Sequence, residues 1–201
     1  MRRGISLVVV EGLLEVSASL KIMNALQVPA GGIIPINTDG CHNFWRFAPK
    51  YNQAAAFIGP ILGLTDLDDH PCPGGLIAAK LKRGRHPDFI LRIARRELES
   101  WLLADTEALS SYLRISPALF PTDPDAEADP KRTLVSLARR SNRTSLREDL
   151  VPEQGSKGVV GKGYIPRMTE FIEKKWRPLE AQHKSESLRR ALAAITRATE
   201  L

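Results

Sequence analysis

The sequence has few cysteines and no long hydrophobic run, and each scarcity excludes a class of protein. Two cysteines among 201 residues, Cys41 and Cys72, are too few and too poorly spaced for a disulfide framework or a zinc knuckle. No apolar stretch approaches the roughly 20 residues that a membrane-spanning helix needs. The apolar run near the start breaks at Glu11 without a small-residue cleavage site, so we expect a strand there and not a signal peptide. We therefore expect a cytoplasmic protein that contacts no membrane.

Acidic charge is scarce in the last third of the chain. Residues 1–131 carry 14 Lys and Arg against 15 Asp and Glu, whereas residues 132–201 carry 15 against 8. The two parts thus have charges of −1 and +7, which sum to the net +6 of the chain. A basic segment beside a near-neutral body favours a polyanionic partner such as nucleic acid. A solvated helical face with no such partner is the alternative.

Strand and helix patterns alternate through the first half of the chain. Residues 5–10 are apolar except for Ser6 and mostly β-branched, which is typical of a strand buried on both faces. The further strands predicted are 33–36, 58–65 and 89–94, and the helices are 13–26, 42–56, 76–83 and 97–113. The helix at 42–56 is expected to be interrupted or to end near Pro49. This order predicts an α/β fold of Rossmann-like type, with a mainly parallel four-stranded sheet and helices on both faces.

A segment rich in proline and acidic residues, 116–130, divides the chain. We expect an α/β domain at 1–115 and a basic helical extension at 116–201 packed on it. Helices are predicted there at 131–140, 165–177 and 185–199, and residues 141–163 are expected to be irregular.

Carboxylates follow two of the predicted strands at once. Glu11 ends the first strand, and Asp66, Asp68 and Asp69 end the third. Ligands of open α/β sheets bind at the carboxyl ends of the strands, and crowded carboxylates repel each other unless a cation joins them. We predict a site for Mg²⁺ or Mn²⁺, with Glu11, Asp66 and Asp68 catalytic and Asp69 a further ligand. The alternative is a polar turn formed by the aspartates and a helix cap formed by Glu11.

The predicted helix 97–113 carries a second group of charged residues. The helix contains Glu97, Glu99, Trp101 and Asp105, and Arg96 directly precedes it. Acids near a helix N-terminus suit the helix dipole, so a structural role is one alternative. In the other alternative, one acid faces the metal cluster or positions Arg96 against phosphate.

The stretch GSKGVVGKGY, residues 155–164, combines glycines with Lys157 and Lys162. Free backbone amides and two lysines can bind phosphate, although the spacing of a Walker A loop is absent. With Arg167 these lysines are the predicted contacts to nucleic acid. A mobile surface loop is the alternative.

The pairing of VVVEG with LTDLDD resembles the Toprim domain, the catalytic module of type IA and type II topoisomerases, primases and OLD-family nucleases. RRELESWLLAD, YIPRMTEFIEKKW and SESLRRAL resemble an uncharacterised Toprim-like family of bacterial proteins for which a role in anti-phage defence has been suggested. The resemblance implies a catalytic Glu11 and a metal-binding pair of Asp66 and Asp68. It assigns no role to Glu97 or Glu99.

The leading hypothesis is therefore a metal-dependent nuclease or phosphodiesterase of Toprim type acting on DNA or RNA. One alternative is a non-enzymatic scaffold or effector module in a defence or toxin complex, beside an ATPase or another defence-system protein. Another is a hydrolase of nucleotides or small phosphoesters.

Overall fold

A parallel sheet of four strands organises the fold. The computed structural model describes residues 4–29 and 33–200. The sheet order is β2-β1-β3-β4, and each neighbouring pair is parallel. The strands are β1 (Leu7–Val10), β2 (Ile36–Asn37), β3 (Ile61–Asp66) and β4 (Phe89–Ala94). The predicted α/β class and parallel sheet are confirmed, and the carboxyl ends of β1 and β3 are neighbours.

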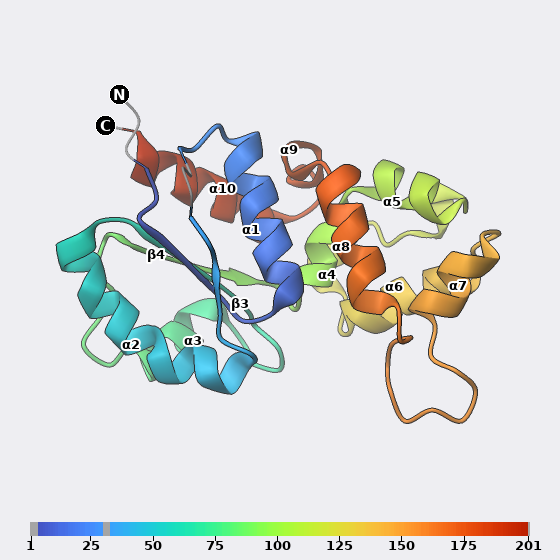
Figure 1. Cartoon of the computed structure of the whole chain (residues 1–201), viewed down its shortest axis with the longest axis horizontal. Coiled ribbons are helices and arrows are strands. Elements are labelled where there is room, and N and C mark those ends of the chain that lie inside the picture. Colours follow the sequence, from blue (N-terminus) through green and yellow to red (C-terminus); the bar gives the residue numbers. More distant parts are fainter. Residues whose placement is uncertain (1–3, 30–32, 201) are drawn as a thin grey trace.

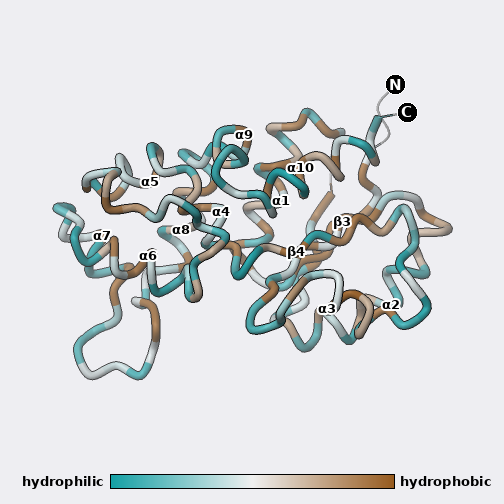
Figure 2. The backbone as a smooth tube through the Cα atoms, turned by 180° about the vertical axis from the view of Figure 1, so that it is seen from behind, coloured by the Kyte–Doolittle hydropathy of each residue, from teal (hydrophilic) through white to brown (hydrophobic). Residues whose placement is uncertain are grey.

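Helices cover both faces of the sheet (Figure 1). α2 (Cys41–Ile58) and α3 (Pro73–Lys80) lie on one face, and α1 (Leu13–Ala25) and α10 (Glu186–Thr199) lie on the other. Every residue of β3 is buried, because this strand lies inside the sheet between two helical layers. Figure 2 colours the backbone by residue hydropathy and shows mainly hydrophobic residues along β3 and β4, between α1 and α10 on one side and α2 and α3 on the other. The continuous apolar pattern of these strands is the pattern of a doubly covered sheet.

The remaining helices gather beyond one end of the sheet (Figure 1). They are α4 (Leu98–Ala104), α5 (Thr106–Leu113), α6 (Pro130–Arg139), α7 (Thr144–Leu150), α8 (Tyr164–Lys174) and α9 (Pro178–Ala181), with 3-10 turns η1 (Pro117–Leu119) and η2 (Pro124–Ala126). One hydrophobic core joins both halves: it runs from Val8 in β1 through Trp101 to Trp176, whose indole Nε1 donates to the Trp101 carbonyl at 3.2 Å. The boundary between 115 and 116 stays a prediction. Within the described ranges, no helix combines the length and the apolar character needed to cross a membrane.

Several expected segments differ in their bounds, and two differ in kind. The single helix predicted at 97–113 is wrong, because it breaks at Asp105 into α4 and α5. The Asp105 carboxylate accepts the amide of Ala108 at 3.3 Å and so begins a new helix. Residues 141–163 are not irregular throughout, since α7 forms inside them with Leu146 and Leu150 buried.

Candidate metal centre at the carboxyl ends of β1 and β3

Glu11 points from the end of β1 towards β3. Its Oε2 accepts the Thr65 hydroxyl at 2.6 Å and the Asp66 amide at 3.3 Å. The alternative that Glu11 caps the next helix is wrong, because Gly12 occupies the N-cap of α1 and no side chain caps it. The parallel pairing of β1 with β3 therefore fixes the Glu11 carboxylate beside the acidic turn.

Asp68 and Cys41 complete a group with Glu11. One potential ligand atom from each of these three residues lies within 4.8 Å of the others. Asp68 has a φ of 50°, which turns the chain back after the strand. Arg96 holds this turn, because its carbonyl accepts the Asp68 amide at 3.0 Å and its guanidinium donates to the Asp68 carbonyl at 3.1 Å. Cys41 begins α2, and its Sγ lies within 4.8 Å of a carboxylate oxygen of Asp68.

Asp66 faces a different direction from Asp68. Its Oδ1 accepts the amide of Leu98, at the start of α4, at 2.9 Å. The backbone amide of Asp66 still contacts Glu11, so the two parts of the site adjoin. Asp69 is exposed and lies outside the group of Glu11, Cys41 and Asp68. The structure thus brings Glu11 and Asp68 together and places Asp66 behind them.

A second, inner cluster of acids surrounds Asp66. Glu15 on α1 and Glu99 on α4 are buried there, and Glu99 is only 2% exposed. The Tyr164 hydroxyl donates to Glu99 Oε1 at 2.9 Å, and Lys131 Nζ lies 3.7 Å from the same oxygen. Lys131 comes from α6 and Tyr164 from α8, so both halves of the chain build this cluster.

The acids outnumber the cations in this region, and their pKa values reflect it. Burial, together with the charges of Glu99 and Glu11, raises the pKa of Glu15 to about 7. Burial and the charges of Glu15 and Glu99 hold the pKa of Asp66 well above its usual range. The pKa values of Glu11 and Asp68 are also raised, first of all by burial. Without a cation, these carboxylates resist simultaneous ionisation.

The acids of the α4 region have three different roles. Glu97 precedes the helix and binds Lys131 twice, accepting its amide at 3.0 Å and its ammonium at 2.8 Å. Glu99 faces the inner cluster and lies outside the group of Glu11, Cys41 and Asp68, so a functional role for it stays a prediction. Asp105 lies elsewhere and holds Arg177, accepting from the guanidinium at 2.6 Å. Arg96 contacts the acidic turn through backbone carbonyls.

Two of the three residues predicted to contact nucleic acid already have acidic partners. Lys162 Nζ lies 2.8 Å from Glu153 Oε1, and Arg167 Nε lies 2.7 Å from Asp149 Oδ2. Lys157 is exposed on the loop that projects between α7 and α8 (Figure 1). The prediction that these residues bind nucleic acid stays a prediction.

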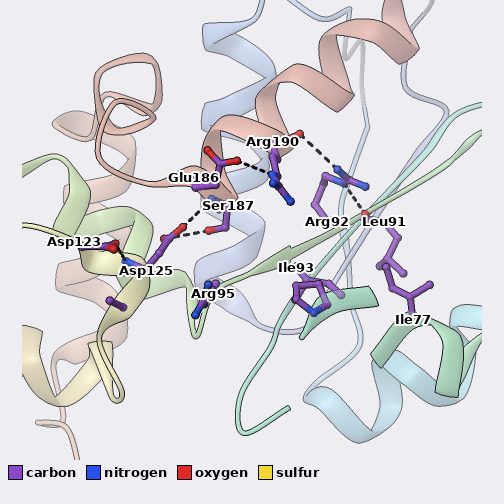
Figure 3. Close-up of a pocket in the computed structure, with 12 residues that line it drawn as sticks. Ile77, Leu91, Arg92, Ile93, Arg95, Asp123, Asp125, Glu186, Ser187 and Arg190 are labelled. Atoms are coloured by element: carbon purple, nitrogen blue, oxygen red, sulfur yellow. Dashed lines mark hydrogen bonds and ion pairs between the residues drawn. The ribbon is translucent and has the colours of Figure 1, made fainter. Parts of the chain in front are cut away.

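A cavity of about 430 Å³ lies at the open edge of β4, beside the start of α10 (Figure 3). Its charged lining residues are Arg92, Arg95, Arg190, Asp123, Asp125 and Glu186. Most of these charges are used inside the protein: Glu186 binds Arg190 at 2.7 Å, and Asp125 accepts the Ser187 amide at 2.7 Å. The cavity carries equal numbers of arginines and acids, in contrast to the acidic cluster.

Sequence reasoning missed Cys41, Glu15 and Lys131. Glu15 lies in the first turn of α1, directly after the end of β1, so its closeness in sequence to the first strand end was a usable signal. Neither Cys41 nor Lys131 had a local signal, because each reaches the site through the packing of a separate helix. Comparisons of the chain with models of protein families, with curated proteins and with solved structures find no match.

Proposed function

We propose that this protein is a Mg²⁺- or Mn²⁺-dependent phosphodiesterase that cleaves nucleic acid. The observation that carries the proposal is the approach of Glu11 and Asp68 from neighbouring strand ends, within 4.8 Å of each other and of Cys41. The adjoining acids Glu15, Asp66 and Glu99 add negative charge that a divalent cation would neutralise.

The donor atoms suit a hard cation. Carboxylate oxygens are the ligands that Mg²⁺ and Mn²⁺ prefer. The one soft donor is Cys41, and burial together with the charges of Glu11 and Asp68 raises the pKa of its thiol to about 11. A neutral thiol is a poor metal ligand, which favours Mg²⁺ or Mn²⁺ over Zn²⁺.

Each residue of the site has a defined task in this proposal. A divalent ion held by Glu11 and Asp68 would supply an activated water and stabilise charge on the phosphate. Thr65 and the Asp66 amide orient the Glu11 carboxylate by their hydrogen bonds. Lys131 and Tyr164 bind Glu99 and so limit the repulsion among the inner acids. Positions fixed in this way are the requirement for electrostatic catalysis.

The test combines metal binding with cleavage. We expect calorimetry to show Mn²⁺ binding to the native protein and a loss of at least about 100-fold in cleavage of mixed oligonucleotides for Glu11→Gln and for Asp68→Asn. Glu173→Gln, on the exposed side of α8, is the charge-matched control and should behave as the native protein. Unchanged metal binding in the Glu11→Gln, Asp68→Asn double variant would refute the proposal.

The same assays separate the competing functions. Cleavage of mononucleotides or small phosphoesters in preference to oligonucleotides would identify a small-molecule hydrolase. Metal binding without cleavage of any substrate would favour the scaffold or effector module, for which an ATPase or another defence-system protein is the expected partner.

A further inference from the structure

The helical layer formed by α2 and α3 contains no acidic residue. Residues 40–65 and 70–87 include six Lys and Arg and neither Asp nor Glu. Both helices lie on the same face of the sheet (Figure 1), and their apolar side chains pack on Val9, Ile61 and Phe89. The positive charges are therefore left on the outer surface of this layer. They are Arg46, Lys50, Lys80, Lys82, Arg83 and Arg85.

These six cations have different surroundings from several basic residues of the C-terminal third. Among the described residues, none of the six forms an ion pair with a carboxylate. By contrast, Arg167, Arg177 and Arg190 each bind an acid of the protein. The excess positive charge of the sequence is thus in its C-terminal third, where cations lie among acids, whereas the α2–α3 layer carries cations and no acid.

A groove of about 810 Å³ lies between the second half of α2 and the loop 80–87. Four of the six cations line it, and no lining residue is acidic. Asn52 of α2 fixes the loop: its amide donates to the Gly84 carbonyl at 3.0 Å, and its carbonyl accepts the His86 amide at 2.7 Å. Because the loop is tied to the helix at both points, the groove is preformed.

An aromatic ring stands at the wall of this groove. Phe57 lines it and is 88% exposed, and the neighbouring Ile58 is 51% exposed. Sequence-independent binding of single-stranded nucleic acid uses this combination, in which bases stack on aromatic rings and cations follow the phosphates. An isolated apolar side chain is common on protein surfaces, but here it adjoins four cations, of which Arg85 also donates to the Phe89 carbonyl at 2.6 Å.

We propose that this groove binds a single strand of DNA or RNA, with Phe57 stacked on a base and Lys80, Lys82, Arg83 and Arg85 on the phosphates. The choice of a nucleic-acid strand as occupant rests on the proposed function. The groove would bind a part of the strand that is distant from the bond cleaved at the metal centre. α2 links the two places, because it begins at Cys41 and ends at Ile58. Its 18 residues span about 27 Å, or about eight stacked nucleotides.

The experiment measures binding without cleavage. A fluorescent 20-nucleotide single strand is titrated in EDTA with the Glu11→Gln, Asp68→Asn protein, and anisotropy gives the affinity at several salt concentrations. Phe57→Ala should weaken binding about 10-fold, within the range of one stacked base, and leave the salt dependence unchanged. Phe57 is so exposed that this variant should fold normally, and Phe57→Trp should retain affinity.

Charge variants give an independent readout. Lys82→Ala with Arg83→Ala should weaken binding and reduce the slope of log affinity against log salt by about 1.4, the loss of two single-strand phosphate contacts. Lys174→Ala with Lys175→Ala removes the same charge from the C-terminal end of α8 and should leave the affinity within about 2-fold of the parent protein. Equal losses in both double variants, or none in the first, would overturn the proposal.

Two further outcomes separate this inference from the proposed function. In one outcome, poly-glutamate displaces the oligonucleotide at equal charge concentration and Phe57→Ala has no effect on binding. This outcome would assign the groove to an acidic polypeptide and overturn the proposal. Cleavage of a dinucleotide, too short to reach the groove, should be unaffected by Lys82→Ala with Arg83→Ala. Strand binding that depends on the groove in a protein that cleaves nothing would leave the inference standing and the proposed nuclease activity refuted.

Discussion

Stability of the metal-free protein should fall as the pH rises from about 4.5 to about 7, because Glu15 is buried beside other acids. Its pKa is raised from 4.5 to about 7 in the folded protein. The folded state therefore binds the proton more tightly than the unfolded chain does. This contribution is complete below pH 4.5 and is lost as the carboxyl ionises on the approach to pH 7.

The size of the effect follows from the pKa shift. Each pKa unit corresponds to about 1.4 kcal/mol, so the change from 4.5 to about 7 represents about 3 kcal/mol in the free energy of unfolding. For a chain of this length that is on the order of 10 °C in Tm. Asp66 and Glu99 change stability in the same direction, since their pKa values are also raised by burial.

The assay is thermal unfolding in EDTA at pH 4.5 and pH 7.5. Glu15→Gln removes the ionisation, so its Tm should exceed that of the native protein at pH 7.5 and nearly match it at pH 4.5. Glu180→Gln, an exposed acid on α9, is the control and should follow the native protein at both values. A difference between Glu15→Gln and the native protein that is the same at both pH values would refute this reasoning. Mg²⁺ should recover part of the stability at pH 7.5 and little at pH 4.5.

Two other substitutions test the packing of the C-terminal half by thermal or urea unfolding. Asp105→Ala should cost about 2–3 kcal/mol, because the buried carboxylate caps α5 and accepts three hydrogen bonds from one arginine. The exposed Glu107→Ala is its control and should cost less than about 1 kcal/mol; equal effects would contradict the burial argument. Gly161→Ala should cost more than about 2 kcal/mol, because an added Cβ would lie 2.3 Å from the Asp149 carbonyl oxygen. Gly158→Ala meets no atom closer than 3.4 Å and should be tolerated, whereas a stable Gly161→Ala protein would show that the loop shifts freely.

The sheet was predictable because its strands are short apolar runs with clear ends. The strand predicted at 89–94 coincides with β4. Helix ends were less predictable, since they depend on caps: Cys72 accepts the Gly75 amide and starts α3 at Pro73, earlier than expected. The break at Asp105 follows from the cap that this residue places on α5, which the periodicity of the apolar residues does not reveal.

The candidate site was predictable only where it follows from strand topology. Glu11 and Asp68 end adjacent parallel strands, and the structure brings them together as the pattern indicated. The alternation of side chains along an extended backbone did not show that Asp66 would face the amide of Leu98. Glu99 was recognised as a candidate without a partner, because Tyr164 and Lys131 reach it only after the C-terminal helices have packed.

Lys131 and Tyr164 have a consequence for how this protein can be divided. A fragment ending at residue 115 would keep Glu15, Asp66 and Glu99 but lose the ammonium and hydroxyl groups that bind Glu99. It would also leave Trp101 without the indole that packs behind it. Transferring the sheet and its acids into another protein would therefore leave the buried carboxylates without their cation and hydroxyl partners. Both halves of the chain must be transferred together.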